Sequence, residues 1–399
     1  MRAEEAAFPP PAHTPHRPDT FEDRHRCPRR PSRHGPRCRA TVSEYDPGRA
    51  PTLARRSATR RCPIDTAALP RFSWSHSRDR TFARCARRYY LRYYAGAGGW
   101  REDADPATRA AYCLRHLITL ELALGIELHE RAREMAGAVR ARRPVPSAET
   151  LRARTRSAMN RLYARHDVAA FLTDPKRSPV RMEVFYERGT DPDRLARLRE
   201  KMELCLEALC GCALWSELAE IRPEDVLLVD RLSAFALDGV TVYAAPDLVY
   251  RTGEGHVIVE WKTGPDPGVR EQTALYGLFV REGLGASDAE GRFQVRLFRL
   301  DLATEERWEI GASDLAGAEA RVRDGAATMR RLLRDAEANA PKPIESFPLT
   351  PHRGQCSLCP FWAICEDEIR TSAPAGLSGS IAPSAGQALP TDTAPERTA

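Results

Sequence analysis

The sequence predicts a single mixed α/β domain, with a sheet flanked by helices and a helical insertion. Helical periodicity dominates the first half of the ordered part, which is expected to run from about residue 72 to about residue 370. Strand-like segments follow, and a long helical segment comes after them. This order of helices, then sheet, then helix is typical of one α/β domain rather than of separate domains.

Helical segments come first along the chain. Residues 107–140 carry leucines at helical spacing, and residues 77–94 predict a basic, aromatic helix. A strand-like piece at 181–186 separates two later helices. We assign about 141–222 to a helical insertion within the domain. The predicted helices of this half cover residues 77–94, 107–140, 147–172 and 192–219.

The predicted sheet follows the insertion. The run Val257-Ile258-Val259 indicates a strand buried on both faces, and Gly253-Glu254-Gly255 supplies the turn before it. Helices are expected at 270–281 and, closing the domain, at 314–338. The predicted strands cover residues 226–237, 240–250, 256–261, 293–300 and 307–310.

The composition limits the class of protein. The chain has 399 residues, of which 42% are hydrophobic, enough for a sizeable core. No apolar run approaches the roughly 18 residues of a membrane span, and the N-terminal segment lacks the apolar stretch of a secretory signal. We therefore expect a cytoplasmic protein with no membrane partner. Its 11 cysteines are expected to be free thiols and metal ligands rather than disulfides.

Both ends of the chain predict disorder. Residues 1–70 are rich in Pro and Arg, and their 14 Arg and 8 acidic residues account for the whole net charge of +6. The remainder is balanced, so net charge is no argument for nucleic-acid binding. We interpret residues 1–70 as a disordered basic leader, either a nucleic-acid arm, a dispensable extension or a wrongly chosen start. Residues 371–399 are interpreted as a disordered tail.

Three candidate catalytic residues lie in the predicted sheet. Asp247 follows Pro246, and Glu260 and Lys262 stand two apart, so their side chains share one face of a strand. If these strands pair, Asp247 and Glu260 converge like the oxygen ligands of Mg²⁺, and Lys262 can act on a metal-bound water. By itself, a Glu-x-Lys is commonly a solvated surface pair.

Three further residues extend this candidate site. Gln272 and Tyr276 are four apart and share one face of a predicted helix, where an ordinary amphipathic helix is the alternative. His129 lies on the helix predicted at 107–140. A lone helical histidine is commonly structural, but a neutral imidazole also joins carboxylates in Mn²⁺ or Mg²⁺ sites.

Four cysteines predict a metal or cluster site. Cys356, Cys359 and Cys365 form a Cys-x2-Cys-x5-Cys pattern, and Cys85 lies 271 residues before it. Thiolates that meet need a metal or cluster to compensate their charge, and all four together would tie the ends of the domain. The spacing leaves Zn²⁺, an iron–sulfur cluster and unliganded core cysteines open. Four others are interpreted as core thiols: Cys113, Cys205, Cys210 and Cys212.

Taken in order, these motifs resemble the PD-(D/E)xK nuclease superfamily. The nearest likeness is to its RecB-like branch with a four-cysteine iron–sulfur cluster, as in the AddB nuclease domain and a CRISPR-associated exonuclease. The resemblance covers residues 73–368. It begins at Ser73-Trp-Ser-His-Ser77 and runs through Cys85 and Tyr89-Tyr90-Leu-Arg-Tyr93, His129, Pro246-Asp247, Glu260-Trp-Lys262, Gln272-x3-Tyr276 and the three late cysteines.

The resemblance implies a restriction-endonuclease-like core sheet and a role for each matched residue. His129, Asp247, Glu260 and the carbonyl of Trp261 would hold Mg²⁺ or Mn²⁺, while Lys262 would act on the attacking water. Gln272 and Tyr276 would support the site or contact DNA. Among the cluster alternatives, the resemblance favours [4Fe–4S] on four ligands: Cys85, Cys356, Cys359 and Cys365.

The expected function is that of a metal-dependent DNA nuclease, an exonuclease or a DNA-end or flap processor, acting on single strands or ends. Arginines and tyrosines crowd residues 78–94, where charge suits phosphates and rings suit bases, although packing explains the tyrosines better. The sequence has no phosphate-loop motif, so a helicase or recombination partner would act in trans. The alternatives are a non-catalytic nucleic-acid-binding or adaptor protein on the same fold and a zinc-stabilised interaction protein.

Overall fold

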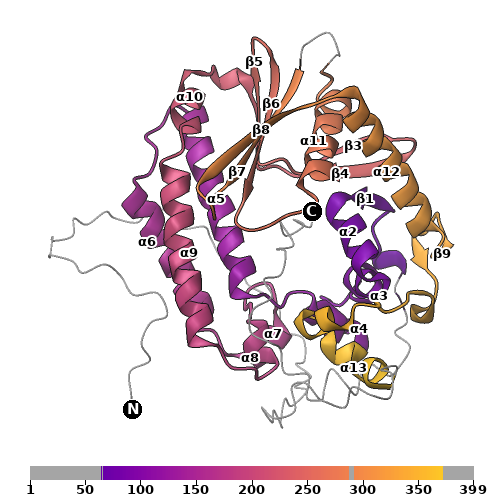
Figure 1. Cartoon of the computed structure of the whole chain (residues 1–399). Helices are drawn as coiled ribbons and strands as arrows, with labels where there is room; N and C mark the ends of the chain where they lie inside the picture. The colour runs from indigo at the N-terminus through magenta and orange to yellow at the C-terminus, as the bar shows by residue number, and fades with distance from the viewer. Residues whose placement is uncertain (1–63, 65, 287–291, 372–399) are drawn as a thin grey trace, which may run out of the picture.

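The protein is described by a computed structural model that covers residues 64, 66–286 and 292–371 (Figure 1). Most of the expected leader and nearly all of the expected tail lie outside the described residues. The end of that leader belongs to the fold, because η2 (Thr66–Ala68) is a short 3-10 helix and Leu69 packs against the hydrophobic core. The described fold therefore begins a few residues before the predicted boundary.

The central element is a mixed five-stranded sheet with the strand order β2-β5-β6-β7-β8. β6 and β7 are parallel, and the other neighbours are antiparallel. The predicted mixed α/β fold is thereby confirmed. The bounds are β2 (Val226–Val229), β5 (Leu248–Thr252), β6 (Gly255–Lys262), β7 (Arg292–Arg299) and β8 (Thr304–Ile310).

The sheet separates two hydrophobic cores, because side chains of a strand alternate between its faces. All eight residues of β6 are buried; Val257 and Val259 join one core, and Ile258 joins the other. Figure 1 shows the two helical layers on opposite sides of the sheet. One layer contains α5 (Leu120–Arg140), α6 (Ala148–Tyr163), α9 (Pro192–Cys210) and α10 (Leu214–Glu220), and the other contains α11 (Val269–Gly283) and α12 (Ala312–Arg330).

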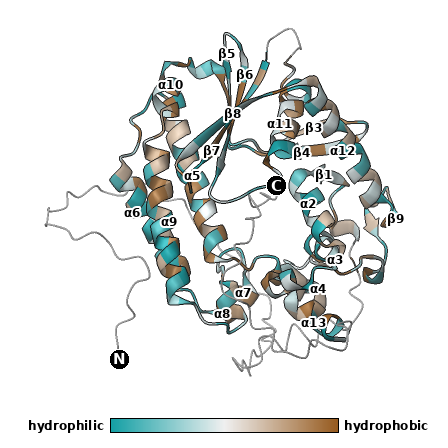
Figure 2. Cartoon of the chain, viewed as in Figure 1, coloured by the Kyte–Doolittle hydropathy of each residue, from teal (hydrophilic) through white to brown (hydrophobic). Residues whose placement is uncertain are grey.

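The helices of the insertion form a full layer of the domain. α6, α9 and α10 pack on α5 and bury their apolar faces in the second core, and Figure 2 shows that α5 and α9 carry both apolar and polar residues. Arg296 on β7 fixes this layer to the sheet. Its buried guanidinium contacts Glu217 of α10, bonds Glu305 of β8 at 2.6 Å and donates to Tyr250 at 3.2 Å.

A second, three-stranded sheet pairs the first strand of the domain with two strands from the middle of the sequence. β1 (Ser73–Ser75) pairs in parallel with β4 (Val240–Ala244), and β3 (Ser233–Leu237) pairs with the other side of β4. Residues 226–237 and 240–250 were each expected to form one strand, and both predictions were wrong. Each segment divides between the two sheets; the second breaks at residues 245–247, where Pro246 cannot donate a ladder hydrogen bond.

Several predicted helices are also divided. Residues 77–94 break at Cys85, whose extended backbone ends α2 (His76–Arg84) and whose sulfur accepts a hydrogen bond from Arg88 N at 3.4 Å. Residues 107–140 break between α4 and α5, because Ile118 pairs there with Arg181. Residues 147–172 divide into α6 and α7, and residues 192–219 divide into α9 and α10. The pieces not yet given bounds are α3 (Ala86–Tyr90), a π-helical turn (Leu91–Ala95), α4 (Pro106–Leu114) and α7 (Val168–Thr173).

Two other segments differ from expectation. The strand predicted at 181–186 is wrong: after the single bridge at Arg181, the chain forms the short helix α8 (Met182–Phe185). The last predicted helix, 314–338, stops at Arg330, and the chain continues as the hairpin of β9 (Leu333–Asp335) and β10 (Ala340–Pro341). No helix among the described residues is both long and apolar enough to span a membrane.

Residues from both ends of the domain meet beside α13 (Trp362–Thr371) (Figure 1). Arg87 is the main contact: its backbone N–H donates to Pro348 O at 3.1 Å, its Nε donates to Phe347 O at 2.8 Å, and its guanidinium pairs with Glu368 at 2.5 Å. Cys85 lies two residues before Arg87, next to the segment that carries the late cysteines.

Candidate active site

The end of the main sheet places the two predicted carboxylates together. β5 and β6 pair with Leu248 opposite Val259, so Asp247 and Glu260 stand at the next position of the same antiparallel register. Glu260 and Lys262 share one face of β6. Trp261 faces the other core, where its ring stacks between Trp215 and Phe298 at centroid distances of 5.5 and 4.6 Å. The predicted strand pairing and the alternation of faces are both confirmed.

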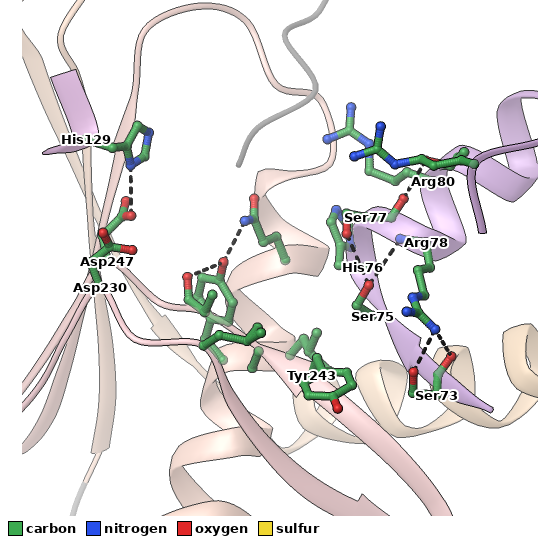
Figure 3. A pocket seen from close by; sticks show the side chains of 18 of the residues that line it. Ser73, Ser75, His76, Ser77, Arg78, Arg80, His129, Asp230, Tyr243 and Asp247 are labelled. Carbon is green, nitrogen blue, oxygen red and sulfur yellow. Dashed lines mark hydrogen bonds and ion pairs between the residues drawn. The ribbon is translucent and has the colours of Figure 1, made fainter. Parts of the chain in front are cut away.

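Asp247 is held by two different elements. Its Oδ1 lies 2.9 Å from Nδ1 of His129 on α5, and its Oδ2 accepts the backbone N–H of Trp261 at 2.8 Å (Figure 3). His129, predicted from an isolated position on a long helix, therefore does reach the carboxylate site. The contact to β6 fixes the orientation of the Asp247 carboxylate relative to Glu260.

Lys262 joins the remaining predicted residues into one network. Its buried ammonium lies 2.8 Å from Glu260 Oε1, 2.9 Å from Asp266 Oδ2 and 2.8 Å from Gln272 Oε1. Gln272 Nε2 donates to the Tyr276 hydroxyl at 2.7 Å, and this hydroxyl donates to the Ala245 carbonyl at 3.1 Å. Gln272 and Tyr276 thus support Lys262 and the loop that carries Asp247.

The charges of the site perturb one another strongly. The pKa of Glu260 is raised to about 8, first by burial and then by the neighbouring Asp247 carboxylate, against the opposing effect of Lys262. Burial also acts to raise the pKa of Asp247, but His129 and the Trp261 N–H outweigh it and lower that pKa. For Lys262, burial acts to lower the pKa, while Glu260 and Asp266 raise it overall. Lys262 is thus held as a cation.

The donor set fits a hard cation in kind. Asp247, Glu260 and His129 supply two carboxylates and an imidazole, and Glu260 Oε2 is buried without a hydrogen-bond partner among the described residues. Their present arrangement does not form a coordination shell: no three His, Cys, Asp or Glu side chains of the described residues are grouped to hold a metal ion. His129 and Lys262 instead neutralise the two carboxylates directly.

The structure adds two partners that the sequence did not reveal. Asp266 bonds both Lys262 and Arg80 of α2, whose Nη1 lies 2.6 Å from Asp266 Oδ1. A third acid four residues after Lys262 was the available signal, but it stands in a Gly/Pro-rich turn rather than on a regular element. Arg80 lies 186 positions earlier, and only the packing of α2 against α11 brings it there.

A cavity of about 540 Å³ adjoins this network (Figure 3). One wall carries His129, Asp247, Gln272 and Tyr276, and the opposite wall is formed by β1 and the start of α2. The site residues therefore lie at a space large enough for part of a ligand. Glu260 and Lys262 are 2% and 1% exposed, which excludes the alternative of a solvated Glu-x-Lys surface pair.

The basic, aromatic segment divides between packing and the cavity. Tyr89, Tyr90 and Tyr94 are buried in the core, so the packing interpretation of these tyrosines is confirmed. Arg87 is committed to the contacts with the C-terminal segment. Among the other arginines of residues 78–94, Arg78, Arg80 and Arg92 line the cavity.

The four predicted cluster cysteines come into mutual electrostatic range. The pKa of Cys356 is raised to about 11, mainly by burial and also by the thiols of Cys359 and Cys85. Burial raises the pKa of Cys365 well above the usual range, with contributions from the other three thiols. The lone early cysteine therefore does meet the late ones. Of the four predicted core thiols, Cys113 and Cys205 are buried, and Cys210 and Cys212 are partly buried against the second core.

A family model described as the PD-(D/E)XK nuclease superfamily matches residues 73–366. The chain belongs to this superfamily. PD-(D/E)XK proteins are generally nucleases and typically use Mg²⁺ or Mn²⁺. No curated protein is similar enough in sequence to match the chain. The PD-(D/E)XK match extends from β1 into α13 and includes the whole site described above.

The raised pKa of Glu260 predicts a pH-dependent cost to folding. The unfolded chain ionises Glu260 near pH 4.5, whereas the folded chain does so near pH 8. Between these values the folded state binds more protons, so stability is lost as pH rises. We expect Glu260→Gln to remove this loss, which is on the order of 3 kcal/mol of unfolding free energy between pH 5 and 8.

Urea unfolding in EDTA across this pH range measures the effect. The pH slope of the variant, rather than its absolute stability, is the readout, because Gln also changes the pairing of Lys262. Glu224→Gln serves as the control, since Glu224 is exposed on the surface beside Arg222. Equal slopes for wild type and Glu260→Gln would contradict the prediction.

Proposed function

We propose that this protein is a Mg²⁺- or Mn²⁺-dependent deoxyribonuclease that hydrolyses phosphodiester bonds at single strands, ends or flaps of DNA. The observation that carries the proposal is the convergence of Asp247, Glu260 and Lys262 in one buried network, which reaches the cavity through Asp247. Two buried carboxylates with a buried lysine are costly to maintain, and cleavage chemistry gives them a role. The superfamily match supports the same activity.

His129, Asp247, Glu260 and the Trp261 carbonyl would hold the ion, which polarises the phosphodiester and supplies a water of lowered pKa. Lys262 stays protonated, so its role is to orient the attacking water and to balance negative charge rather than to accept the proton. Gln272 Oε1 accepts a hydrogen bond from the same ammonium and helps to fix it. Tyr276 in turn holds Gln272 and the Asp247 loop.

Action at ends rather than at a defined sequence is supported by the architecture. The helices around the main sheet belong to the two cores of one domain, and the described residues show no separate target-recognition module. A helicase or recombination partner would then supply strand separation in trans. We propose that residues 1–69 and the expected tail take no part in catalysis.

We also propose that Cys85, Cys356, Cys359 and Cys365 hold a [4Fe–4S] cluster, with Zn²⁺ as the alternative. The neighbouring thiols help to raise the pKa of Cys356 and Cys365, and a cationic centre would stabilise the four groups as thiolates. Four thiolates can bind either a polynuclear cluster or a single Zn²⁺ ion. The resemblance noted for the sequence favours the cluster.

Asp247→Ala is expected to reduce metal-dependent DNA cleavage to background while the fold and iron content stay unchanged. The reason is local, because Asp247 lies in the main sheet and the cysteines lie beside α13. Time courses on single-stranded, duplex and flapped DNA with Mg²⁺ and Mn²⁺ measure this. Asp301→Ala, a carboxylate paired with Arg299 outside the cavity, is the control and is expected to keep activity.

Lys262→Arg belongs to the same experiment and is expected to slow cleavage by about a hundredfold or more. The guanidinium keeps the charge, but its planar shape does not reproduce three close contacts around a buried ammonium. Wild type and Asp247→Ala that bind DNA equally and are equally inert would overturn the enzyme proposal in favour of an adaptor.

Protein purified without oxygen is expected to be brown and to contain iron. Cys85→Ser and Cys359→Ser should lose the colour equally, because each removes one of four ligands, and both should unfold more readily, because the link between the domain ends is lost. Cys113→Ser is the matched control: its thiol packs near Leu172 O and should leave the iron in place. Colourless protein with stoichiometric zinc would exclude the iron–sulfur cluster and leave the nuclease proposal intact.

A further inference from the structure

The wall of the cavity opposite Asp247 is the first turn of α2 and the strand that leads into it. Ser75 caps this helix, because its Oγ accepts the backbone N–H of Arg78 at 3.2 Å and lies 3.1 Å from Ser77 Oγ. Ser75, His76, Ser77 and Arg80 all line the cavity. The first N–H groups of a helix have no partner within the helix, and the helix dipole favours an anion there.

His76 supplies independent evidence for a ligand at this wall. Its side chain is only 7% exposed, yet neither ring nitrogen has a hydrogen-bond partner among the described residues. Figure 3 shows His76 and Ser77 on the side of α2 that faces Asp247 and His129 across the cavity. Buried polar groups normally have partners, so an unpaired imidazole that lines a cavity indicates a missing one.

The charges around His76 favour an anionic ligand. The pKa of His76 is lowered to about 3, mainly by burial and also by Arg80, Arg321 and Lys262, against the opposing effect of Asp266. The imidazole is therefore neutral, keeps one N–H to donate, and stands in a positive field. The acid within the first turn, Asp79, does not oppose this: it pairs with Arg321 of α12 at 2.8 Å and does not line the cavity.

We propose that His76 and the first turn of α2 bind a phosphate group of the nucleic acid, as a subsite separate from the carboxylates. The donors suit a tetrahedral anion: an imidazole N–H, two serine hydroxyls, backbone N–H groups and the nearby Arg80. Arg80 and Lys262 share Asp266, so the subsite is joined to the catalytic lysine by two ion pairs. The proposal rests on the proposed function.

The phosphate has two sources: an internal phosphodiester beside the scissile one, or a terminal phosphate. A terminal phosphate would make the subsite a device for recognising ends, and an internal one would make it a register for the strand. The chemistry at His76 is the same in both cases. The experiment separates them by the ends of the probe.

The test uses the full chain carrying Asp247→Ala in EDTA, so that binding is measured without cleavage. Inorganic phosphate is assayed by its shift of the thermal midpoint. Short single-stranded oligodeoxynucleotides with a 5′-phosphate, a 3′-phosphate or hydroxyl ends are assayed by fluorescence anisotropy. We expect His76→Leu to weaken binding by about tenfold or more, as for loss of a hydrogen bond to a charged group, and His76→Gln to retain most of it.

If His76 were only structural, His76→Leu would lower the thermal midpoint even without phosphate. The proposal predicts otherwise. Because the ring is buried and without a hydrogen-bond partner among the described residues, His76→Leu should keep or raise the thermal midpoint in the absence of phosphate and lose only the phosphate-induced shift. His256→Leu, which alters a buried histidine outside the cavity, is the control and should keep the affinity. A His76→Leu protein that binds every probe as its parent does would overturn the proposal.

The outcomes also separate this proposal from the nuclease function. Dependence on a 5′- or 3′-phosphate assigns the subsite to a strand end, and equal loss on all oligonucleotides assigns it to an internal phosphodiester. A His76-dependent phosphate shift in a protein whose wild type never cleaves DNA would keep the subsite and reject the nuclease. Cleavage by wild type with no effect of His76→Leu on any probe would reject the subsite and keep the nuclease function.

Discussion

The buried ammonium of Lys262 is the constraint on which the rest of the site depends. A charge with almost no solvent contact is tolerable only when it is paired and hydrogen-bonded. Its partners come from three places: Glu260 on the same strand, Asp266 in the following turn and Gln272 on α11. The contacts of Lys262 consequently connect the strand, the turn and the helix. Because Asp266 also pairs with Arg80, the same network reaches α2 and the far wall of the cavity.

The second organising contact joins the ends of the domain. Arg87 bonds the backbone at Phe347 and Pro348, next to the break in the helix at Cys85. From the insertion, the Tyr186 hydroxyl donates to the Pro360 carbonyl at 2.6 Å, between two of the late cysteines. These contacts hold the cysteine segment from two sides. The insertion therefore bears on the cysteine group as well as on the sheet, a role that its sequence did not suggest.

Local pattern predicted the central elements well and their boundaries poorly. The apolar run of β6, the turn before it and the amphipathic α11 follow from side-chain alternation and helical spacing, which are local properties. The predictions of continuous helices over residues 77–94 and 107–140 were wrong because the breaks in these helices have non-local causes. At Cys85 the helix yields to the meeting with residues 347–368, and at Ile118 it yields to a bridge with Arg181. The composition of residues 181–186 predicts a strand, but only Arg181 forms a β-bridge.

The sequence by itself determined that Asp247 stands opposite Glu260, that Lys262 shares the face of Glu260, and that one early and three late cysteines lie near the two ends of the domain. These follow from residue type, from strand alternation and from the order of the motifs. The family resemblance placed His129 at the site. Tertiary structure alone decided that Asp266 bonds both Lys262 and Arg80 and that His76 lies at the cavity without a hydrogen-bond partner among the described residues. The reason is physical: these positions are separated by tens to hundreds of residues, and only the packing of helices on a twisted sheet sets which distant side chains approach within a hydrogen bond.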